Sequence, residues 1–160
     1  MRIVEADLFS GEMDVICHCA NLHGVWGAGF VLPLKKRYPE AYQADLATLK
    51  GDNSKLGFYS SAVVNGGKLT IVNLYAQMGI GNDGNPLNRN AQYDFLFDAL
   101  YRLCSDISEK AEKEKTIIGC PEICCGLAGG RPRIVYAIIE EVEKMFPKVE
   151  FHLYKLPTNK

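Results

Sequence analysis

The sequence has almost no net charge and no long apolar run. Eighteen lysine and arginine residues nearly balance nineteen aspartate and glutamate residues, so 160 residues carry a formal net charge of −1. A dedicated nucleic-acid or membrane-surface binder usually has a basic excess, and the balance argues against both partners. No eighteen apolar residues run together, and the first residues lack the apolar core of a secretion signal. We therefore expect a cytoplasmic protein without a membrane partner.

The six cysteines also lack the spacing of a typical zinc site. One set of four ligands can be drawn from Cys17, His18, Cys19 and Cys124, but no pair within that set is separated by two to four residues, as in most zinc loops. Most of the cysteines fall in or beside strand-like patterns, where a free thiol behaves as a small apolar side chain. In a cytoplasmic protein we expect reduced, buried cysteines, with the zinc site as the alternative, and no metal or other cofactor.

Internal repeats, low-complexity segments and an interdomain linker are absent too, which favours one domain over residues 1–160. Apolar and β-branched runs predict strands over residues 3–8, 14–19, 58–64, 69–75, 116–120 and 149–156. Helical periodicity and flanking signals predict helices over residues 29–38, 40–49, 90–113 and 134–145. This alternation of strands and helices predicts an α/β fold with three α/β/α layers and a mixed, mostly parallel sheet.

Two glycine-rich segments each follow a predicted strand and precede a predicted helix. The first glycine loop is GVWGAG, residues 24–29, and the second is GLAGG, residues 126–130. Glycine lets backbone amides approach an anion closely, and a helix N-terminus adds partial positive charge. Ligands of such sheets bind beyond the carboxyl ends of the strands, where both loops would lie. The pair predicts a diphosphate held from two sides.

Three motifs in order resemble a macro domain, and the resemblance spans nearly the whole chain. They are Asp7 in EADLF, HCANLHGVWGAGF over residues 18–30, and CCGLAGGRP over residues 124–132. The likeness is closest to the branch that contains ADP-ribose 1″-phosphate phosphatases and terminal ADP-ribose-glutamate hydrolases. That branch also has a helix ending like KKRYP, residues 35–39. The resemblance implies an ADP-ribose-type ligand, free or attached to a macromolecule.

The resemblance also implies roles for single residues. Asp7 resembles the acid that accepts a hydrogen bond from the adenine amine, and Asn21 resembles the asparagine that contacts the distal ribose. His18 resembles a histidine implicated in catalysis, where an imidazole could activate water or hold a phosphate. Each of these residues has a structural alternative. Asp7 could cap a turn, Asn21 could brace the loop, and His18 could be a buried histidine at the end of a strand. The implied ligand-binding residues are Asp7, Leu8, Asn21, Trp26, Gly27, Ala28, Gly29, Phe30, Cys125, Gly126, Leu127, Ala128, Gly129, Gly130, Arg131 and Tyr154.

The sequence departs from that branch where an acid is expected. Ala128 and Arg131 stand at the two places in the second glycine loop where the branch has an aspartate, and Arg131 could contact a phosphate instead. The segment before the long helix contains Arg89 but no lysine, which argues against a covalent lysine mechanism. Asp83, in the same segment, could supply a carboxylate.

His18 and the branch resemblance favour a phosphatase acting on ADP-ribose 1″-phosphate, and the missing acid favours a non-catalytic binder. A mono-ADP-ribosyl hydrolase is the third candidate.

Overall fold

One mixed sheet lies at the centre of the molecule. The structure is a computed structural model that describes residues 1–80 and 89–157. Within these residues the strands are β1 (Arg2–Glu5), β2 (Val15–Asn21), β3 (Tyr59–Val64), β4 (Leu69–Gln77), β5 (Thr116–Cys120) and β6 (Val149–Lys155). They are ordered β1-β6-β5-β2-β4-β3, and every pairing is parallel except the antiparallel β3–β4 hairpin. The predicted mixed, mostly parallel sheet is confirmed.

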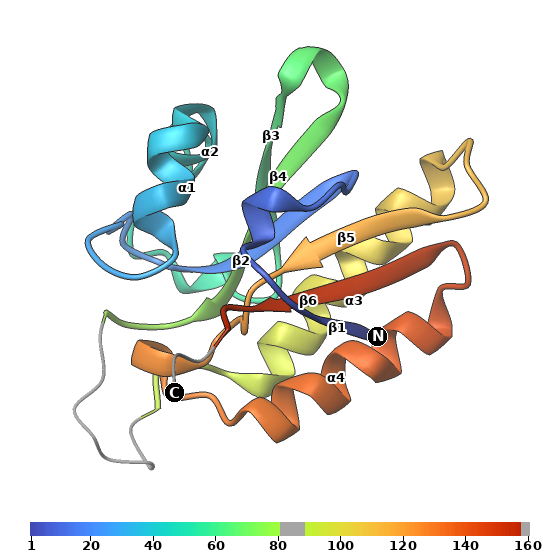
Figure 1. Ribbon diagram of the computed structural model, residues 1–160. Coiled ribbons are helices and arrows are strands. Elements are labelled where there is room, and N and C mark those ends of the chain that lie inside the picture. The colour runs from blue at the N-terminus through green and yellow to red at the C-terminus, as the bar shows by residue number, and fades with distance from the viewer. Residues whose placement is uncertain (81–88, 158–160) are drawn as a thin grey trace.

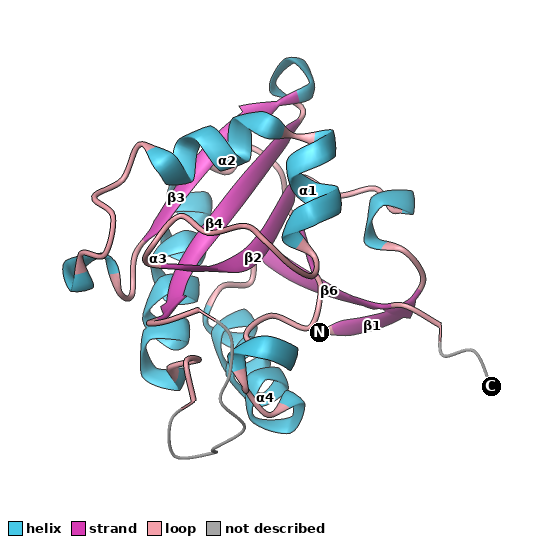
Figure 2. Cartoon of the chain, turned by 90° about the vertical axis from the view of Figure 1, so that its left-hand side faces the viewer, coloured by secondary structure: helices cyan, strands magenta, loops and turns pink. Residues whose placement is uncertain are grey.

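Helices cover both faces of this sheet (Figure 1). The helices are α1 (Val31–Arg37), α2 (Pro39–Leu46), α3 (Tyr93–Lys110) and α4 (Pro132–Met145). The first two lie on one face, and α3 and α4 lie side by side on the other, as a view turned by 90° also shows (Figure 2). The expected three α/β/α layers are therefore present. In the described parts of the chain, no helix is long and apolar enough to cross a membrane.

Apolar periodicity explains how the helices attach. In α4, Val135, Ile139 and Val142 are fully buried, and their spacing puts them on one stripe of the helix. Pro132 opens this helix, where its missing N–H costs nothing. The β3–β4 turn needs left-handed backbone at Asn65 (φ 52°), Gly66 (φ 63°) and Gly67 (φ 91°), as the Asn-Gly-Gly sequence predicts.

The predicted element boundaries shift at several places. The first predicted strand ends at Glu5 because the Asp7 side chain accepts a hydrogen bond from Phe9 N at 3.0 Å and caps a 3₁₀ turn over Leu8–Ser10. The long helix begins at Tyr93 rather than at residue 90, and β4 continues to Gln77. Asp83, the candidate carboxylate, lies outside the described residues.

The expectation that all six cysteines are reduced is wrong for one pair. A disulfide joins Cys19 at the end of β2 to Cys124 in the loop after β5, across 105 residues of sequence. Pairing of β2 with β5 brings these two strand ends together, which the sequence spacing could not reveal. The alternative zinc site is wrong as well, because two of its four ligands are joined to each other. Burial raises the pKa of the free Cys125 thiol to about 11, so that thiol is protonated at neutral pH.

Candidate functional site

A cavity of about 700 Å³ lies at the carboxyl edge of the sheet, beyond the ends of β2 and β5. The first glycine loop and the second glycine loop form parts of its wall, together with the two strand ends and residues after β4. This is the position that the sheet topology predicts for a ligand. The lining residues are His18, Cys19, Ala20, Asn21, Val25, Trp26, Gly27, Ala28, Gly29, Phe30, Val31, Gln77, Ile80, Pro121, Glu122, Ile123, Cys124, Cys125, Gly126, Leu127, Ala128 and Pro132.

Asn21 holds the first glycine loop in shape. Its Nδ2 donates to Val25 O at 2.7 Å, and its Oδ1 accepts from His23 N at 2.9 Å and from Val25 N at 3.3 Å. With these bonds Asn21 braces the loop, which is the structural alternative to the expected ribose contact. Gly29 has φ 76°, and no described atom lies within 4 Å of the place where a Cβ would be. A ligand can therefore approach the backbone closely there.

The second glycine loop is shaped by tight backbone contacts. Gly130 N donates to Cys124 O at 2.7 Å, and a Cβ on Gly130 would stand 2.1 Å from that oxygen. Gly130 is therefore required for closing the loop. Gly126 has φ 63°, and a Cβ there would meet no described atom within 4 Å, so its backbone is accessible from the cavity.

His18 is part of the cavity wall but has only 2% of its surface exposed. Its Nε2 lies 2.6 Å from Asn73 Oδ1, and its ring packs edge-on against Trp26 with centroids 5.1 Å apart. Burial lowers the pKa of His18 below 6.5, although the hydrogen bond to Asn73 and the charge of Asp45 oppose the shift. The imidazole is therefore neutral at pH 7.

Trp26 is fixed beside His18. The indole is 5% exposed, and its Nε1 donates to Asp45 Oδ2 at 2.8 Å. Tyr42 packs edge-on against the indole with ring centroids 5.1 Å apart. Trp26 both lines the cavity and belongs to the core beneath α1 and α2.

Glu122 is a carboxylate in the cavity wall that the sequence analysis missed. Its Oε2 accepts from Tyr136 OH at 2.8 Å, and its Oε1 lies 3.9 Å from Lys155 Nζ. Burial and the Glu122 carboxylate raise the pKa of Tyr136 to about 12, so the phenol keeps its proton and donates. The signal was present, because Glu122 is the second residue after the predicted strand over residues 116–120. Gln77, Ile80 and Val25 were missed too.

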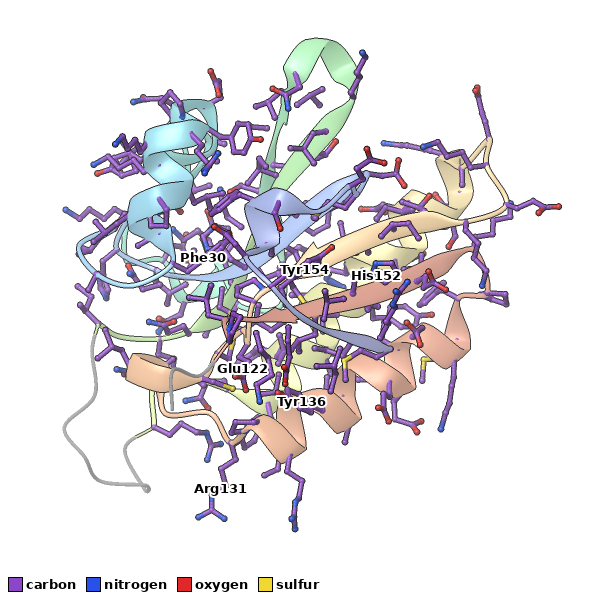
Figure 3. All side chains as sticks on the ribbon, viewed as in Figure 1. Phe30, Glu122, Arg131, Tyr136, His152 and Tyr154 are labelled. Atoms are coloured by element: carbon purple, nitrogen blue, oxygen red, sulfur yellow. A yellow bond between two sulfur atoms is a disulfide. The ribbon has the colours of Figure 1, made fainter. Side chains whose placement is uncertain are left out.

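Six predicted site residues are absent from the cavity wall that the described residues form, namely Asp7, Leu8, Gly129, Gly130, Arg131 and Tyr154. Figure 3 shows the Arg131 side chain pointing away from the sheet at the start of α4, which does not support a phosphate contact. Tyr154 is 9% exposed and packs in the core, with its hydroxyl against Gly11.

Asp7 lies close to the cavity through its neighbours. It is exposed and caps the turn that carries Phe9. The Phe9 ring stacks on Phe30, a lining residue, with centroids 5.5 Å apart. Asp7 and Leu8 are thus placed beside the Phe30 end of the cavity. In Figure 3, Phe30 lies to the left of Tyr154, and Glu122 lies below both of them.

No family model matches the sequence, and no curated protein matches it either. Solved structures do. A protein from Bacteroides thetaiotaomicron is 27% identical over 98% of this chain and 99% of its own, with a TM-score of 0.82. The macrodomain of Mycobacterium tuberculosis DarG is 19% identical over 98% of this chain and 97% of its own, with a TM-score of 0.78.

Thermosipho africanus DarTG, solved in complex with ADP-ribose, is 18% identical, with a TM-score of 0.77 over 99% of this chain and 42% of its own. Identities this low establish architecture and not activity. The strand order, the helices on both faces and these likenesses together show that the chain has the macrodomain fold.

Proposed function

We propose that the chain binds ADP-ribose in this cavity, with the diphosphate between Gly27–Gly29 and the second glycine loop. The main support for this proposal is that two glycine loops, 97 or more residues apart in sequence, line one cavity at the carboxyl edge of the sheet. Thermosipho africanus DarTG, of which 42% matches this chain, was solved in complex with ADP-ribose, and this likeness supports the choice of ligand. Residues 1–160 would form a single macro domain that acts on ADP-ribose derivatives or ADP-ribosylated macromolecules.

The size and polarity of the cavity fit this ligand. A volume of about 700 Å³ falls within the range of small-molecule sites, roughly 300–1,000 Å³. Its wall contains no lysine or arginine among the described residues, so backbone amides must supply the donors to phosphate. Open space beside Gly29 and Gly126 gives a diphosphate access to those amides.

The roles that we propose for the other predicted site residues follow from where these residues lie relative to the cavity. Asp7 and Leu8 would contact adenine beyond the stacked Phe9 and Phe30, with Tyr154 supporting that end from the core. Asn21 Nδ2 donates one of its two N–H groups to Val25 O, so the second N–H would donate to a hydroxyl of the distal ribose.

For turnover, a phosphatase acting on ADP-ribose 1″-phosphate is our first candidate. A neutral His18 in the wall can accept a proton from water, and Glu122 supplies a carboxylate on the side of the second loop. The deep burial of His18 favours the alternative, a binder without turnover. A mono-ADP-ribosyl hydrolase remains the third candidate.

Two assays on the same preparation test the proposal. Calorimetric titration with ADP-ribose should give one site per chain, and an absence of heat and of saturation would refute the binding proposal. Phosphate release from ADP-ribose 1″-phosphate, lost by roughly 10²–10⁴-fold in His18→Ala, would select the phosphatase. Binding without phosphate release would select the binder, and release of ADP-ribose from a modified protein would select the hydrolase.

A further inference from the structure

A chain of hydrogen-bonded side chains connects two residues of the cavity wall through the interior. Its ends, His18 and Trp26, line the cavity, and its other members do not. The chain crosses from β2 through β4 and β3 to α2. In order, its members are His18, Asn73, Ser60, Tyr75, Asp45 and Trp26.

The direction of every bond is traced from Asp45, whose two carboxyl oxygens each accept from a neighbour in the chain. It accepts from Trp26 Nε1 at 2.8 Å and from Tyr75 OH at 2.6 Å. With its proton directed to Asp45, the Tyr75 oxygen accepts from Ser60 Oγ at 2.8 Å. Ser60 Oγ, whose proton is then used, accepts from Asn73 Nδ2 at 3.0 Å.

The orientation of the Asn73 amide determines which of its atoms faces His18. Its Nδ2 also donates to Ala41 O at 3.0 Å, so both amide protons have acceptors and the amide cannot flip without losing them. Asn73 Oδ1 is then the atom that faces His18 Nε2, at 2.6 Å, and it must accept. The proton of the neutral imidazole therefore sits on Nε2, and Nδ1 has a bare lone pair. Nδ1 is buried and makes no hydrogen bond to a described residue, although the backbone of Cys19 is a further polar neighbour of the ring and opposes the lowering of the His18 pKa.

We infer that Asn73 is a positioning residue that fixes His18 in the Nε2–H tautomer, so that His18 Nδ1 accepts a hydrogen bond from a ribose hydroxyl of the bound nucleotide. This rests on the proposed binding of ADP-ribose and is distinct from the phosphatase candidate, in which the same Nδ1 lone pair would take a proton from water. A bare lone pair repels a phosphate oxygen, which carries no proton, and attracts an O–H donor. Trp26 and Phe30 pack against the imidazole, so the contact requires a small displacement of one of these rings. The lowered pKa of His18 is consistent with a neutral ring.

The tautomer is tested first, in the ligand-free protein, by ¹⁵N chemical shifts of the imidazole nitrogens at pH 7. The His18 signals are assigned by their loss in His18→Phe. We expect a protonated Nε2 and an unprotonated Nδ1 in the wild type. Protonation at Nδ1, or an imidazolium at pH 7, would overturn the inference whether or not ADP-ribose binds.

Two variants separate positioning from general damage to the fold. Asn73→Asp places a carboxylate at Nε2, so the His18 titration should move to higher pH. Ser60→Ala breaks the chain but leaves Asn73 bonded to Ala41 O, so the tautomer should persist. A tautomer lost in Ser60→Ala, or a His18 titration unmoved in a folded Asn73→Asp, would contradict the role of Asn73. If Asn73→Asp does not fold, the wild-type tautomer and Ser60→Ala still decide the matter.

The hydroxyl contact is tested by the pH dependence of ADP-ribose affinity. The diphosphate of ADP-ribose does not titrate between pH 5 and 8, so a change in affinity over this range reports on His18. The charge of Asp45 acts on the His18 ring. Tyr75 has a pKa raised to about 12 and keeps its proton throughout. Protonation of Nδ1 removes the acceptor and should weaken binding by roughly 2- to 12-fold, at higher pH in Asn73→Asp than in the wild type.

Tighter binding on protonation would show a phosphate contact and overturn the hydroxyl assignment, as would an affinity that is unchanged while the His18 shifts titrate. If the wild type does not bind ADP-ribose at all, the proposed function fails, and the chemical shifts still decide the role of Asn73.

Discussion

At the scale of single residues, Gly29 offers the sharpest test of where the diphosphate lies. Gly29→Glu would put a carboxylate beside it, and like charges brought together in a binding site cost several kcal/mol. We expect affinity for ADP-ribose to fall by at least about tenfold, measured by calorimetry. Gly66→Glu is the matched control, because Gly66 has a similar φ of 63° and equally open space, but lies in the β3–β4 turn. Equal affinities in the two folded variants would refute the placement.

The role of Asp7 is tested by comparing the affinities of two ligands, ADP-ribose, which contains adenine, and its inosine analogue, which contains hypoxanthine. Asp7→Ala should cost about 0.5–1.5 kcal/mol of binding for ADP-ribose and less for its inosine analogue, which lacks the amine. Because Asp7 also caps the turn that carries Phe9, Asp52→Ala serves as the control. Asp52 accepts from Ser54 N at 2.8 Å in a similar turn that does not line the cavity. If the wild type binds both ligands equally, Asp7 does not read adenine.

Burial of His18 predicts a pH dependence of stability. Its pKa is lowered in the folded protein, whereas an unfolded chain has an ordinary histidine pKa of about 6.5. Between these values the unfolded state binds more protons. The free energy of unfolding is therefore fully kept above about pH 6.5 and declines as the pH falls below it.

Urea denaturation at several pH values should show this decline in the wild type and a shallower one in His18→Gln. An identical decline in the two proteins would mean that His18 does not cause it.

At the scale of elements, periodicity predicted the strands and helices, and local hydrogen bonding decided their ends. The stripe in α4 and the Asn-Gly-Gly turn carry their own signal within a few residues, so both were predictable. Asp7 shortened the first strand through a side-chain bond that alternation does not report. The Cys19–Cys124 link was invisible for another reason, since nothing in the spacing says which strand ends meet.

The disulfide can be tested by counting the cysteines that react with a thiol reagent. Under denaturing, non-reducing conditions a thiol reagent should modify the four free cysteines, Cys17, Cys104, Cys120 and Cys125, and after reduction all six. A link that closes a loop of 105 residues stabilises a fold by roughly 4–5 kcal/mol in the chain-entropy account. Reduction should therefore lower the melting temperature. Six reactive thiols before reduction would contradict the link.

At the scale of the whole molecule, the topology gathers the candidate site. The ends of β2 and β5 meet at one edge of the sheet, and this brings the two glycine loops together as their separate strand–loop–helix patterns predicted. Glu122 was missed because a carboxylate was sought inside the second loop, whereas the strand end before it reaches the same wall. The partners of His18 were equally hidden, because Asn73 and Asp45 come from β4 and α2.

The central claim is that ADP-ribose occupies the cavity between the two glycine loops. An amide chemical-shift titration of the protein with ADP-ribose tests it most directly, because it reports affinity and location together. We expect saturable shifts, one ligand per chain, that are largest at Ala28, Gly29 and Gly126, which line this cavity and not the second one. An absence of saturable shifts would contradict the account. So would shifts confined to the second cavity of about 420 Å³ around His23, Lys50 and Lys55.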